Sequence, residues 1–209
     1  MTDKIVASEV PGSENQSSEN PRAQITLASA SPRRAQLLRQ IRVSYEVLPV
    51  DIDESHQPGE TAQQYVQRLA LHKARQGYAR TSVRPALGGD TIVVSGRHIL
   101  GKPQNPQVAG EMLTLLSGKT HQVMTAVALV CGKNEYCALN ISEVEFTELN
   151  SEQIAFYCQS DEPLDKAGAY GIQGLAAQFI KNIRGSYSGI MGLPLFETAQ
   201  LLKQANIQM

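Results

Sequence analysis

Apolar residues recur along the chain in short runs that have the length and the flanking turn residues of β-strands. Six such runs cover residues 25–28, 45–50, 86–94, 123–131, 138–146 and 178–183. The fourth and fifth runs are expected to pair antiparallel around a turn at 132–135. Ser95-Gly96-Arg97 predicts another hairpin turn. The runs therefore predict a sheet that contains antiparallel pairs.

Helix signals fall between these strands. Ser31-Pro32 and Asn105-Pro106 each combine a capping side chain with proline at the first helical position, and they predict helices that end near Gln40 and Gly118. Further helices are expected at 61–80, 151–158 and 194–205. The apolar stripe of the 61–80 helix comprises Ala62, Tyr65, Val66, Leu69 and Ala70. Because helices and strands intermingle, the expected fold class is α/β, a mixed sheet flanked by helices.

Residues 1–22 differ from the rest, because Pro11 to Pro21 is polar and rich in turn-forming residues. We expect a disordered tail there and a single folded domain over 23–209. The 209 residues, 42% hydrophobic and 19% charged, are typical of a globular protein. A net charge of -1 argues against binding to a nucleic-acid strand, which needs a basic surplus.

Membrane and secretory signals are not predicted. No apolar run approaches the roughly 20 residues of a membrane span, and no apolar core follows Lys4 as a signal peptide would require. The three cysteines (Cys131, Cys137 and Cys158) form no CxxC pair, which favours free thiols in a reducing cytoplasm. A cytoplasmic location is therefore expected.

The first candidate for chemistry is the segment Ser29 to Arg34, where a strand end runs into a helix start. Arg33 and Arg34 lie in the first turn, where the partial positive charge of the helix terminus opposes them. An anion such as a polyphosphate would remove that conflict. A solvated surface pair beside an ordinary serine cap is the alternative, and local physics does not separate the two.

Two further candidates are charged residues at apolar positions. Lys73 follows Leu69 by four residues, so it lies on the buried stripe of its helix and either extends to water or meets an anion. Asp90 lies beside Gly89 in an apolar strand, where a carboxylate needs a partner such as a divalent metal. A turn aspartate that bonds its own backbone is the simpler alternative.

Lys102, in Leu100-Gly101-Lys102-Pro103, would by default be a surface lysine. The segment from Asp165 to Gly174 carries three glycines, which allow close approach to a ligand or unusual dihedral angles. It matches neither a P-loop nor GxGxxG. The four histidines show no zinc-ligand spacing, and the GxSxG motif of serine hydrolases is absent.

Taken in order, these segments resemble the Maf family, and within it the dTTP/UTP pyrophosphatase branch. The matching segments are SASPRR (29–34), GDT (89–91), LGKP (100–103), LSGKTHQVMTAVAL (116–129), EPLDKAGAYGIQG (162–174) and GSYSGIMGLPL (185–195). The resemblance implies an elongated mixed sheet with flanking helices around a nucleotide cleft, similar to the inosine triphosphate pyrophosphatase fold. It also implies a divalent metal cation, Mg²⁺ or Mn²⁺, and a homodimer.

The resemblance also implies roles for individual residues. Asp90 matches the catalytic acidic residue. The positions tied to substrate choice are Arg33, Thr91 and Gln173. The phosphate-binding set is Ser29, Arg34, Lys73 and Lys102. Glu54, in an acidic loop with Asp51 and Asp53, and Asp90 are the implied metal ligands. Asp90 either takes the proton of the attacking water or holds the metal, and the sequence does not separate these roles.

The implied reaction is hydrolysis of dTTP, UTP or modified pyrimidine nucleotides, a house-cleaning activity, to the monophosphate and pyrophosphate. Two alternatives stay open. One is a nucleotide-binding regulator of septum formation that needs no turnover. The other is an enzyme of the same fold that acts on 7-methyl-GTP or on inosine and xanthosine triphosphates, against which the segment from Asp165 to Gly174 argues.

Overall fold

The computed structural model describes residues 23–160 and 162–208, so the tail expected at 1–22 lies outside the described part. The fold is one seven-stranded sheet in the order β2-β1-β3-β5-β6-β7, with β4 paired to β3. The strands are β1 (Ile25–Leu27), β2 (Tyr45–Val47), β3 (Ala86–Ser95), β4 (His98–Leu100), β5 (Thr120–Cys131), β6 (Asn134–Phe146) and β7 (Ile180–Arg184).

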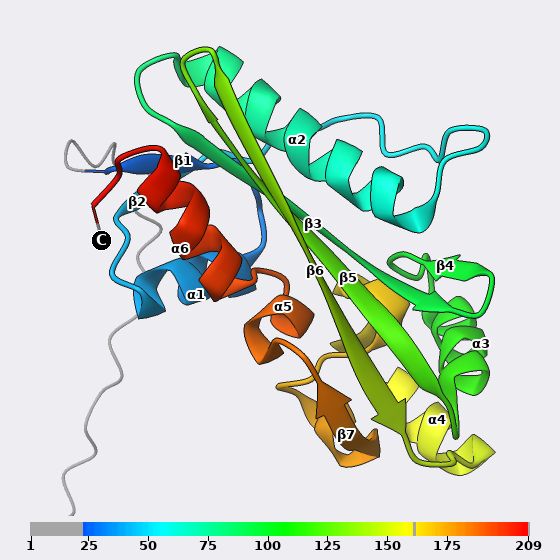
Figure 1. The fold of residues 1–209 in the computed structure, drawn as a ribbon. Coiled ribbons are helices and arrows are strands. Elements are labelled where there is room, and N and C mark those ends of the chain that lie inside the picture. Colours follow the sequence, from blue (N-terminus) through cyan, green and yellow to red (C-terminus); the bar gives the residue numbers. More distant parts are fainter. Residues whose placement is uncertain (1–22, 161, 209) are drawn as a thin grey trace, which may run out of the picture.

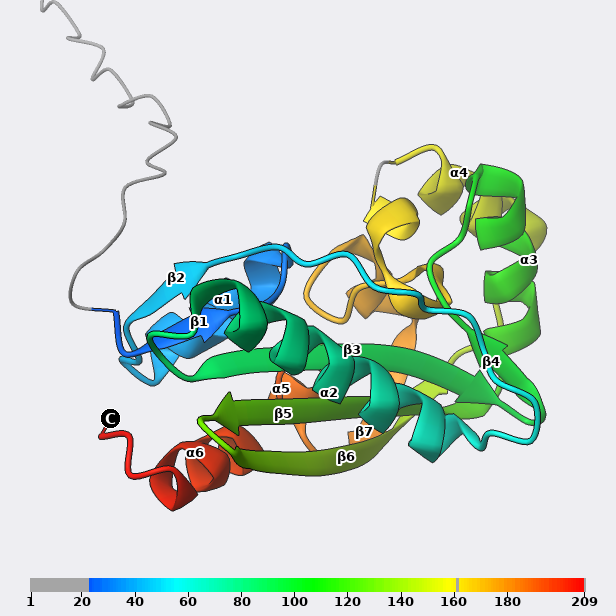
Figure 2. The same cartoon turned by 90° about the horizontal axis from the view of Figure 1, so that it is seen from above.

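The sheet is mixed. β1 pairs parallel with β2 and β3, whereas β3, β5, β6 and β7 pair antiparallel with one another in turn. The three long strands β3, β5 and β6 connect the two ends of an elongated molecule (Figures 1 and 2). At one end lie β1, β2, α1 and α6, and at the other lie α3 and α4.

Six α-helices and three short 3₁₀ helices surround the sheet in the described residues. The α-helices are α1 (Pro32–Gln40), α2 (Ala62–Thr81), α3 (Pro106–Leu116), α4 (Ser151–Cys158), α5 (Tyr187–Met191) and α6 (Leu195–Gln204). The 3₁₀ helices are η1 (Glu162–Asp165), η2 (Ala167–Ala169) and η3 (Leu175–Phe179).

Helices cover both faces of the long strands. Along β5, Ala126 and Ala128 pack in the apolar cluster under α2, whereas Val127 and Leu129 pack in the cluster that contains residues of α1 and α6. Alternate residues of a strand point to opposite faces, so α2 and α6 cover opposite sides of the sheet. A third cluster lies under α3 and α4 and includes the aromatic residue Phe146.

The capping signals in the sequence are confirmed. Ser31 and Asn105 each accept a hydrogen bond from the backbone N–H three residues further on, with proline at the first helical position. Asn150 caps α4 in a reciprocal capping box with Gln153. The three cysteines form no disulfide, as expected.

Three details of the sequence prediction are wrong. The turn expected at 132–135 is shorter, because Cys131 pairs directly with Asn134 and the strands extend further. The strand expected at 178–183 begins only at Ile180, because residues 175–179 form η3. The five-residue helix α5 was not expected. Its cap Ser186 accepts from the N–H of Gly189.

Candidate active site

A cleft of about 490 Å³ lies between the two ends of the molecule, within the usual size range of small-molecule sites. Its wall is built from the β1–α1 turn, α2, β3, the residues after β4 and the segment that includes η1 and η2. Five basic and three acidic side chains border it. All nine residues singled out in the sequence line this cleft, namely Ser29, Arg33, Arg34, Glu54, Lys73, Asp90, Thr91, Lys102 and Gln173.

Lys73 forms the centre of the charged part of the cleft. Its ammonium Nζ lies 2.7 Å from Asp90 Oδ1 and 2.6 Å from Glu54 Oε1. The Lys73 and Asp90 side chains are only 12% and 11% exposed, whereas that of Glu54 is 57% exposed. The anions that Lys73 meets are thus two carboxylates of the chain, and Asp90 has the partner that a charge in an apolar strand requires.

Asp90 is not a turn residue, because it lies in the middle of β3 and pairs with Ala126 of β5. The alternative of a turn aspartate is therefore wrong. Lys73 reaches this position because α2 packs closely on β3. A Cβ atom at Gly88 would lie 2.5 Å from the backbone nitrogen of Ala74, so the absence of a side chain permits that approach.

Arg34 is held by three acceptors rather than solvated. Its Nε donates to the carbonyl of Gly192 at 2.8 Å, and its two terminal nitrogens donate to Ser29 Oγ at 3.1 Å and Thr91 Oγ1 at 3.2 Å. Burial lowers the pKa of the Arg34 guanidinium, and the Asp90 charge opposes this shift. A fixed, partly buried cation at the start of α1 is suited to bind an anion.

Thr91 connects Arg34 to a residue that the sequence did not single out. Thr125, its pairing partner on β5, has a hydroxyl 2.8 Å from the carbonyl of Gly189 and 3.0 Å from Thr91 Oγ1. A hydroxyl has only one proton. Because the Gly189 carbonyl can only accept, Thr125 donates to it, and Thr91 accepts from Arg34 while donating to Thr125.

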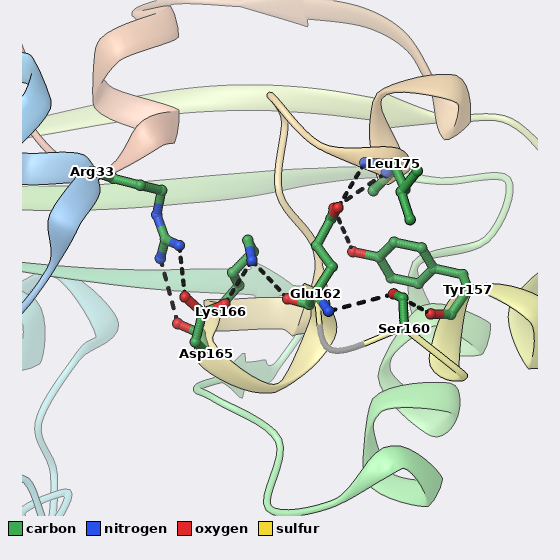
Figure 3. Close-up of polar contacts among 8 residues, drawn as sticks. Arg33, Tyr157, Ser160, Glu162, Asp165, Lys166 and Leu175 are labelled. Carbon is green, nitrogen blue, oxygen red and sulfur yellow. Dashed lines mark hydrogen bonds and ion pairs between the residues drawn. The ribbon is translucent and has the colours of Figure 1, made fainter. Parts of the chain in front are cut away.

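Arg33 extends across the cleft to the segment that includes η1 and η2 (Figure 3). Its Nη1 donates to Asp165 Oδ2 at 2.9 Å and its Nη2 to the Asp165 carbonyl at 3.4 Å. Lys166 contacts the other carboxylate oxygen of Asp165 at 2.6 Å. Burial raises the pKa of Asp165, but hydrogen bonds from Lys166 and Arg33 outweigh it, so the net pKa is lowered.

Gln173 lies at the tip of a turn that is closed by a hydrogen bond from Gly174 N–H to the Gly171 carbonyl at 3.1 Å. Its side chain is exposed at the cleft, as is that of Lys102. Among the described residues, none forms a hydrogen bond with the Gln173 amide. Of the three glycines in this segment, Gly168 has a positive φ of 68°, one of the two uses expected from the sequence, and Gly171 and Gly174 leave room for the side chains of Lys166 and Glu162.

Tyr170 also borders the cleft and was not singled out in the sequence. Behind it, buried His121 places Nε2 2.8 Å from the Tyr170 hydroxyl, and its ring stacks edge-on against Phe146 and Tyr170. Burial lowers the pKa of His121 to about 4. The sequence offered one sign of this residue's importance, a tyrosine within the glycine-rich segment. Its contact with His121 joins residues 49 positions apart, so no local pattern reveals it.

The acidic side of this cleft carries two carboxylates, the type of ligand that a divalent cation prefers. Among the described residues, no group of three or more histidine, cysteine, aspartate or glutamate side chains is arranged to hold a metal. Glu54 and Asp90 nevertheless direct carboxylate oxygens at the same ammonium. Two carboxylates completed by substrate phosphates and water are a usual way of binding Mg²⁺.

None of the helices in residues 23–160 and 162–208 has both the length and the apolar composition of a membrane span.

The chain is similar to known proteins over most of its length. The chain is 52% identical over 181 residues to the dTTP/UTP pyrophosphatase of Escherichia coli (strain K12), with coverage of 86% of this chain and 92% of that protein. It is 51% identical to the dTTP/UTP pyrophosphatase of Aromatoleum aromaticum, with coverage of 87% and 95%.

Solved structures show the same fold. A HAM1 protein from Coxiella burnetii aligns with a TM-score of 0.50 at 18% identity, over 86% of this chain and 98% of that one. The Staphylococcus aureus Ham1 protein aligns with a TM-score of 0.50 at 13% identity, over 87% and 98%. The expected similarity to the inosine triphosphate pyrophosphatase fold is confirmed. Residues 24–205 match the Maf-like protein family, and the chain therefore belongs to that family.

Proposed function

We propose that the chain is a nucleoside triphosphate pyrophosphatase that hydrolyses dTTP and UTP to the monophosphate and pyrophosphate. One observation carries the proposal: a single cleft is bordered by five basic side chains, the Lys73-linked carboxylates and the turn that bears Gln173. Relatives that share half of their residues with the chain are named dTTP/UTP pyrophosphatases, which supports the same substrates here.

The basic side chains account for triphosphate binding. Arg34 is already oriented by Ser29 and Thr91, so little side-chain entropy remains to be lost when it binds a phosphate. Lys73 and Lys102 border the same cleft. Fixed positive charges that need no reorganisation stabilise the negative charge that develops on the leaving pyrophosphate.

Glu54 would hold a Mg²⁺ or Mn²⁺ ion, and Asp90 would be a second ligand only if it does not act as the base. Such an ion neutralises charge on phosphate oxygens and lowers the pKa of a coordinated water. Lys73 contacts one oxygen of each carboxylate, Glu54 Oε1 and Asp90 Oδ1, so a cation would bind through the other oxygens. Oxygen ligands of this kind suit hard divalent cations better than zinc.

The hydrolysis requires a water oxygen to bond to the α-phosphorus while the bond from that phosphorus to the bridging oxygen breaks. Pyrophosphate leaves with the electron pair, and the water must lose a proton. We assign that proton to Asp90 Oδ2, because Oδ1 already accepts from Lys73. Positioning and charge neutralisation then supply most of the rate enhancement.

Gln173 supplies base selection. An amide carbonyl can accept from N3–H of uracil or thymine while the NH₂ donates to O4. Cytosine presents the reverse pattern and would leave both groups unpaired. Arg33 lies near this selection element, because Asp165 joins it to the segment that leads to Gln173.

Resemblance to the family supports a proposal for the physiological setting. We infer a cytoplasmic enzyme that acts as a homodimer and removes normal or modified pyrimidine nucleotides. Analytical ultracentrifugation of the full chain tests the dimer: a monomer at micromolar concentration contradicts it.

A nucleotide panel tests the activity. The chain is incubated with dTTP, UTP, CTP, ITP and 7-methyl-GTP, with Mg²⁺, with Mn²⁺ or with a chelator. We expect monophosphate and pyrophosphate from dTTP and UTP, and loss of turnover with the chelator. Binding of UTP without turnover would instead support the regulator, and preference for ITP or 7-methyl-GTP would overturn the pyrimidine assignment.

A further inference from the structure

The Glu162 carboxylate receives three hydrogen bonds from two parts of the chain (Figure 3). The Tyr157 hydroxyl donates to its Oε1 at 2.9 Å, the Leu175 N–H to its Oε2 at 2.7 Å and the Ala176 N–H to its Oε1 at 3.3 Å. Charge-assisted bonds of this kind are about twice as strong as neutral ones. Glu162 therefore fastens the start of η3 to the end of α4.

The backbone of Glu162 is itself held in place. Its N–H donates to Ser160 Oγ at 3.4 Å, and Ser160 Oγ donates in turn to the Tyr157 carbonyl at 2.7 Å. Lys166 Nζ donates to the Glu162 carbonyl at 2.7 Å. Tyr157 is 1% exposed, and burial together with its bond to Glu162 raises its pKa, so the phenol remains a donor.

The turn that bears Gln173 lies directly before this anchor. Gly171 and Gly174 bracket the turn, and each leaves room for a side chain of the anchor. A Cβ at Gly174 would overlap the Glu162 carboxylate, and a Cβ at Gly171 would lie 2.7 Å from Lys166 Cε. The glycines thus allow Glu162 and Lys166 to pack against both ends of the turn.

Base selection requires a fixed amide, since a freely rotating one would accept either pattern of donors and acceptors. In the described part of the chain, no hydrogen bond fixes the Gln173 amide itself. The turn sets the backbone position from which this side chain extends, and the contacts of Glu162 and Lys166 hold the turn.

We propose that Glu162 is a positioning residue for base selection, whose carboxylate anchors residues 174–176 and so holds the backbone from which the Gln173 amide reaches the pyrimidine edge. This inference rests on the proposed function, because it assigns the origin of the preference for uracil and thymine over cytosine. Glu162 itself does not border the cleft among the described residues, so it acts through the turn.

The first experiment measures kcat/KM for UTP and for CTP with Glu162→Gln. In this variant one carboxylate oxygen becomes an NH₂ group, which cannot accept a hydrogen bond from a backbone N–H. We expect the UTP/CTP ratio to fall by at least about tenfold, as lost buried hydrogen bonds would cause. Glu152→Gln, with the same charge change on the exposed face of α4, serves as the matched control and should leave the ratio unchanged. An unfolded fraction of the variant would lower kcat/KM for UTP and for CTP by the same factor and leave their ratio unchanged.

A double variant tests whether Glu162 acts through Gln173. If it does, Glu162→Gln combined with Gln173→Ala should have the same UTP/CTP ratio as Gln173→Ala alone. Additive effects of the two substitutions on the ratio would contradict the inference.

Hydrogen exchange provides a readout that does not depend on activity. The amides of Leu175 and Ala176 should exchange at least about tenfold faster in Glu162→Gln than in Glu152→Gln. Tyr157→Phe, which removes one donor and keeps the ring, should shift exchange and the UTP/CTP ratio in the same direction by less. It replaces Glu162→Gln if that variant does not fold.

These experiments distinguish failure of the Glu162 role from failure of the proposed function. If the wild-type chain prefers UTP and the ratio and the exchange rates stay unchanged in Glu162→Gln, the anchoring role is overturned and the proposed function stands. If the wild-type chain does not release pyrophosphate from UTP, the proposed function fails, whatever the exchange rates show about the anchor.

Discussion

At the scale of single residues, the contact of Lys73 with two carboxylates defines the charged part of the cleft. Neither the lysine nor the aspartate would be stable at its apolar position without a partner. Their mutual contact at 2.7 Å meets both requirements. Asp90 is therefore the residue whose replacement should affect the chemical step most.

Replacing Asp90 by asparagine keeps the shape of the side chain and removes the proton acceptor. We expect kcat for UTP to fall by at least about 10²-fold, the low end for loss of an acid–base group. Asp51→Asn makes the same change at an exposed position of the nearby loop and should stay within about twofold of wild type. Near-normal turnover in Asp90→Asn would remove Asp90 from the chemical step.

Gln173→Ala tests base recognition directly. Removing the amide should reduce the preference for UTP and dTTP over CTP, because the pocket no longer distinguishes the two hydrogen-bonding patterns. The measurement is kcat/KM for the three nucleotides, with the exposed Gln107→Ala on α3 as the control. Equal ratios in wild type and Gln173→Ala would assign selection to other residues.

His121 predicts how stability depends on pH. Burial lowers its pKa to about 4, so between that value and the ordinary 6.5 the unfolded chain binds a proton that the folded chain does not. The contribution of His121 to the free energy of unfolding should therefore be full above pH 6.5 and decrease as the pH falls toward 4, by on the order of 3 kcal/mol in total.

Urea unfolding at several pH values measures this dependence. His121→Phe keeps an aromatic ring against Phe146 and should flatten the slope between pH 6.5 and 4, even if the Tyr170 hydroxyl loses its partner. His98→Gln, at an exposed position on β4, should retain the wild-type slope. A slope that survives in His121→Phe would assign the pH dependence to other groups.

At the scale of elements, the Thr91–Thr125 contact fixes β3 to β5 and, through Gly189, to α5. Thr125→Val keeps the shape and removes the hydroxyl, so Thr91 loses the acceptor that orients it toward Arg34. We expect kcat/KM for UTP to fall about tenfold, as one buried hydrogen bond implies. Thr125→Ser retains the hydroxyl and should recover most of the activity, whereas equal losses in both variants would indicate a packing effect.

Helix starts were predictable because their signals are local. Ser31, Asn105 and Asn150 bond to backbone groups three residues away, so sequence position determines the contact. The start of β7 was not predictable in this way. Residues 175–176 are held by Glu162, 13 and 14 residues earlier, and this contact places η3 where a strand was expected.

At the scale of the whole molecule, the sequence predicted the α/β class and the set of residues that line one cleft, through resemblance to a family. The local sequence around each single residue did not decide between a functional and a purely structural role. Lys73 and Asp90 are 17 residues apart, and they meet only because α2 packs on β3 at Gly88. Arg33 and Asp165 are 132 residues apart and come from opposite ends of the fold.

We propose that this cleft directs water to the α-phosphorus of a pyrimidine nucleoside triphosphate, and isotope transfer from water reports which phosphorus is attacked. The chain is incubated with UTP and Mg²⁺ in H₂¹⁸O, and the products are analysed by mass spectrometry. We predict one ¹⁸O atom in UMP and none in pyrophosphate. Label in pyrophosphate, or formation of UDP and phosphate, would rule out attack at the α-phosphorus.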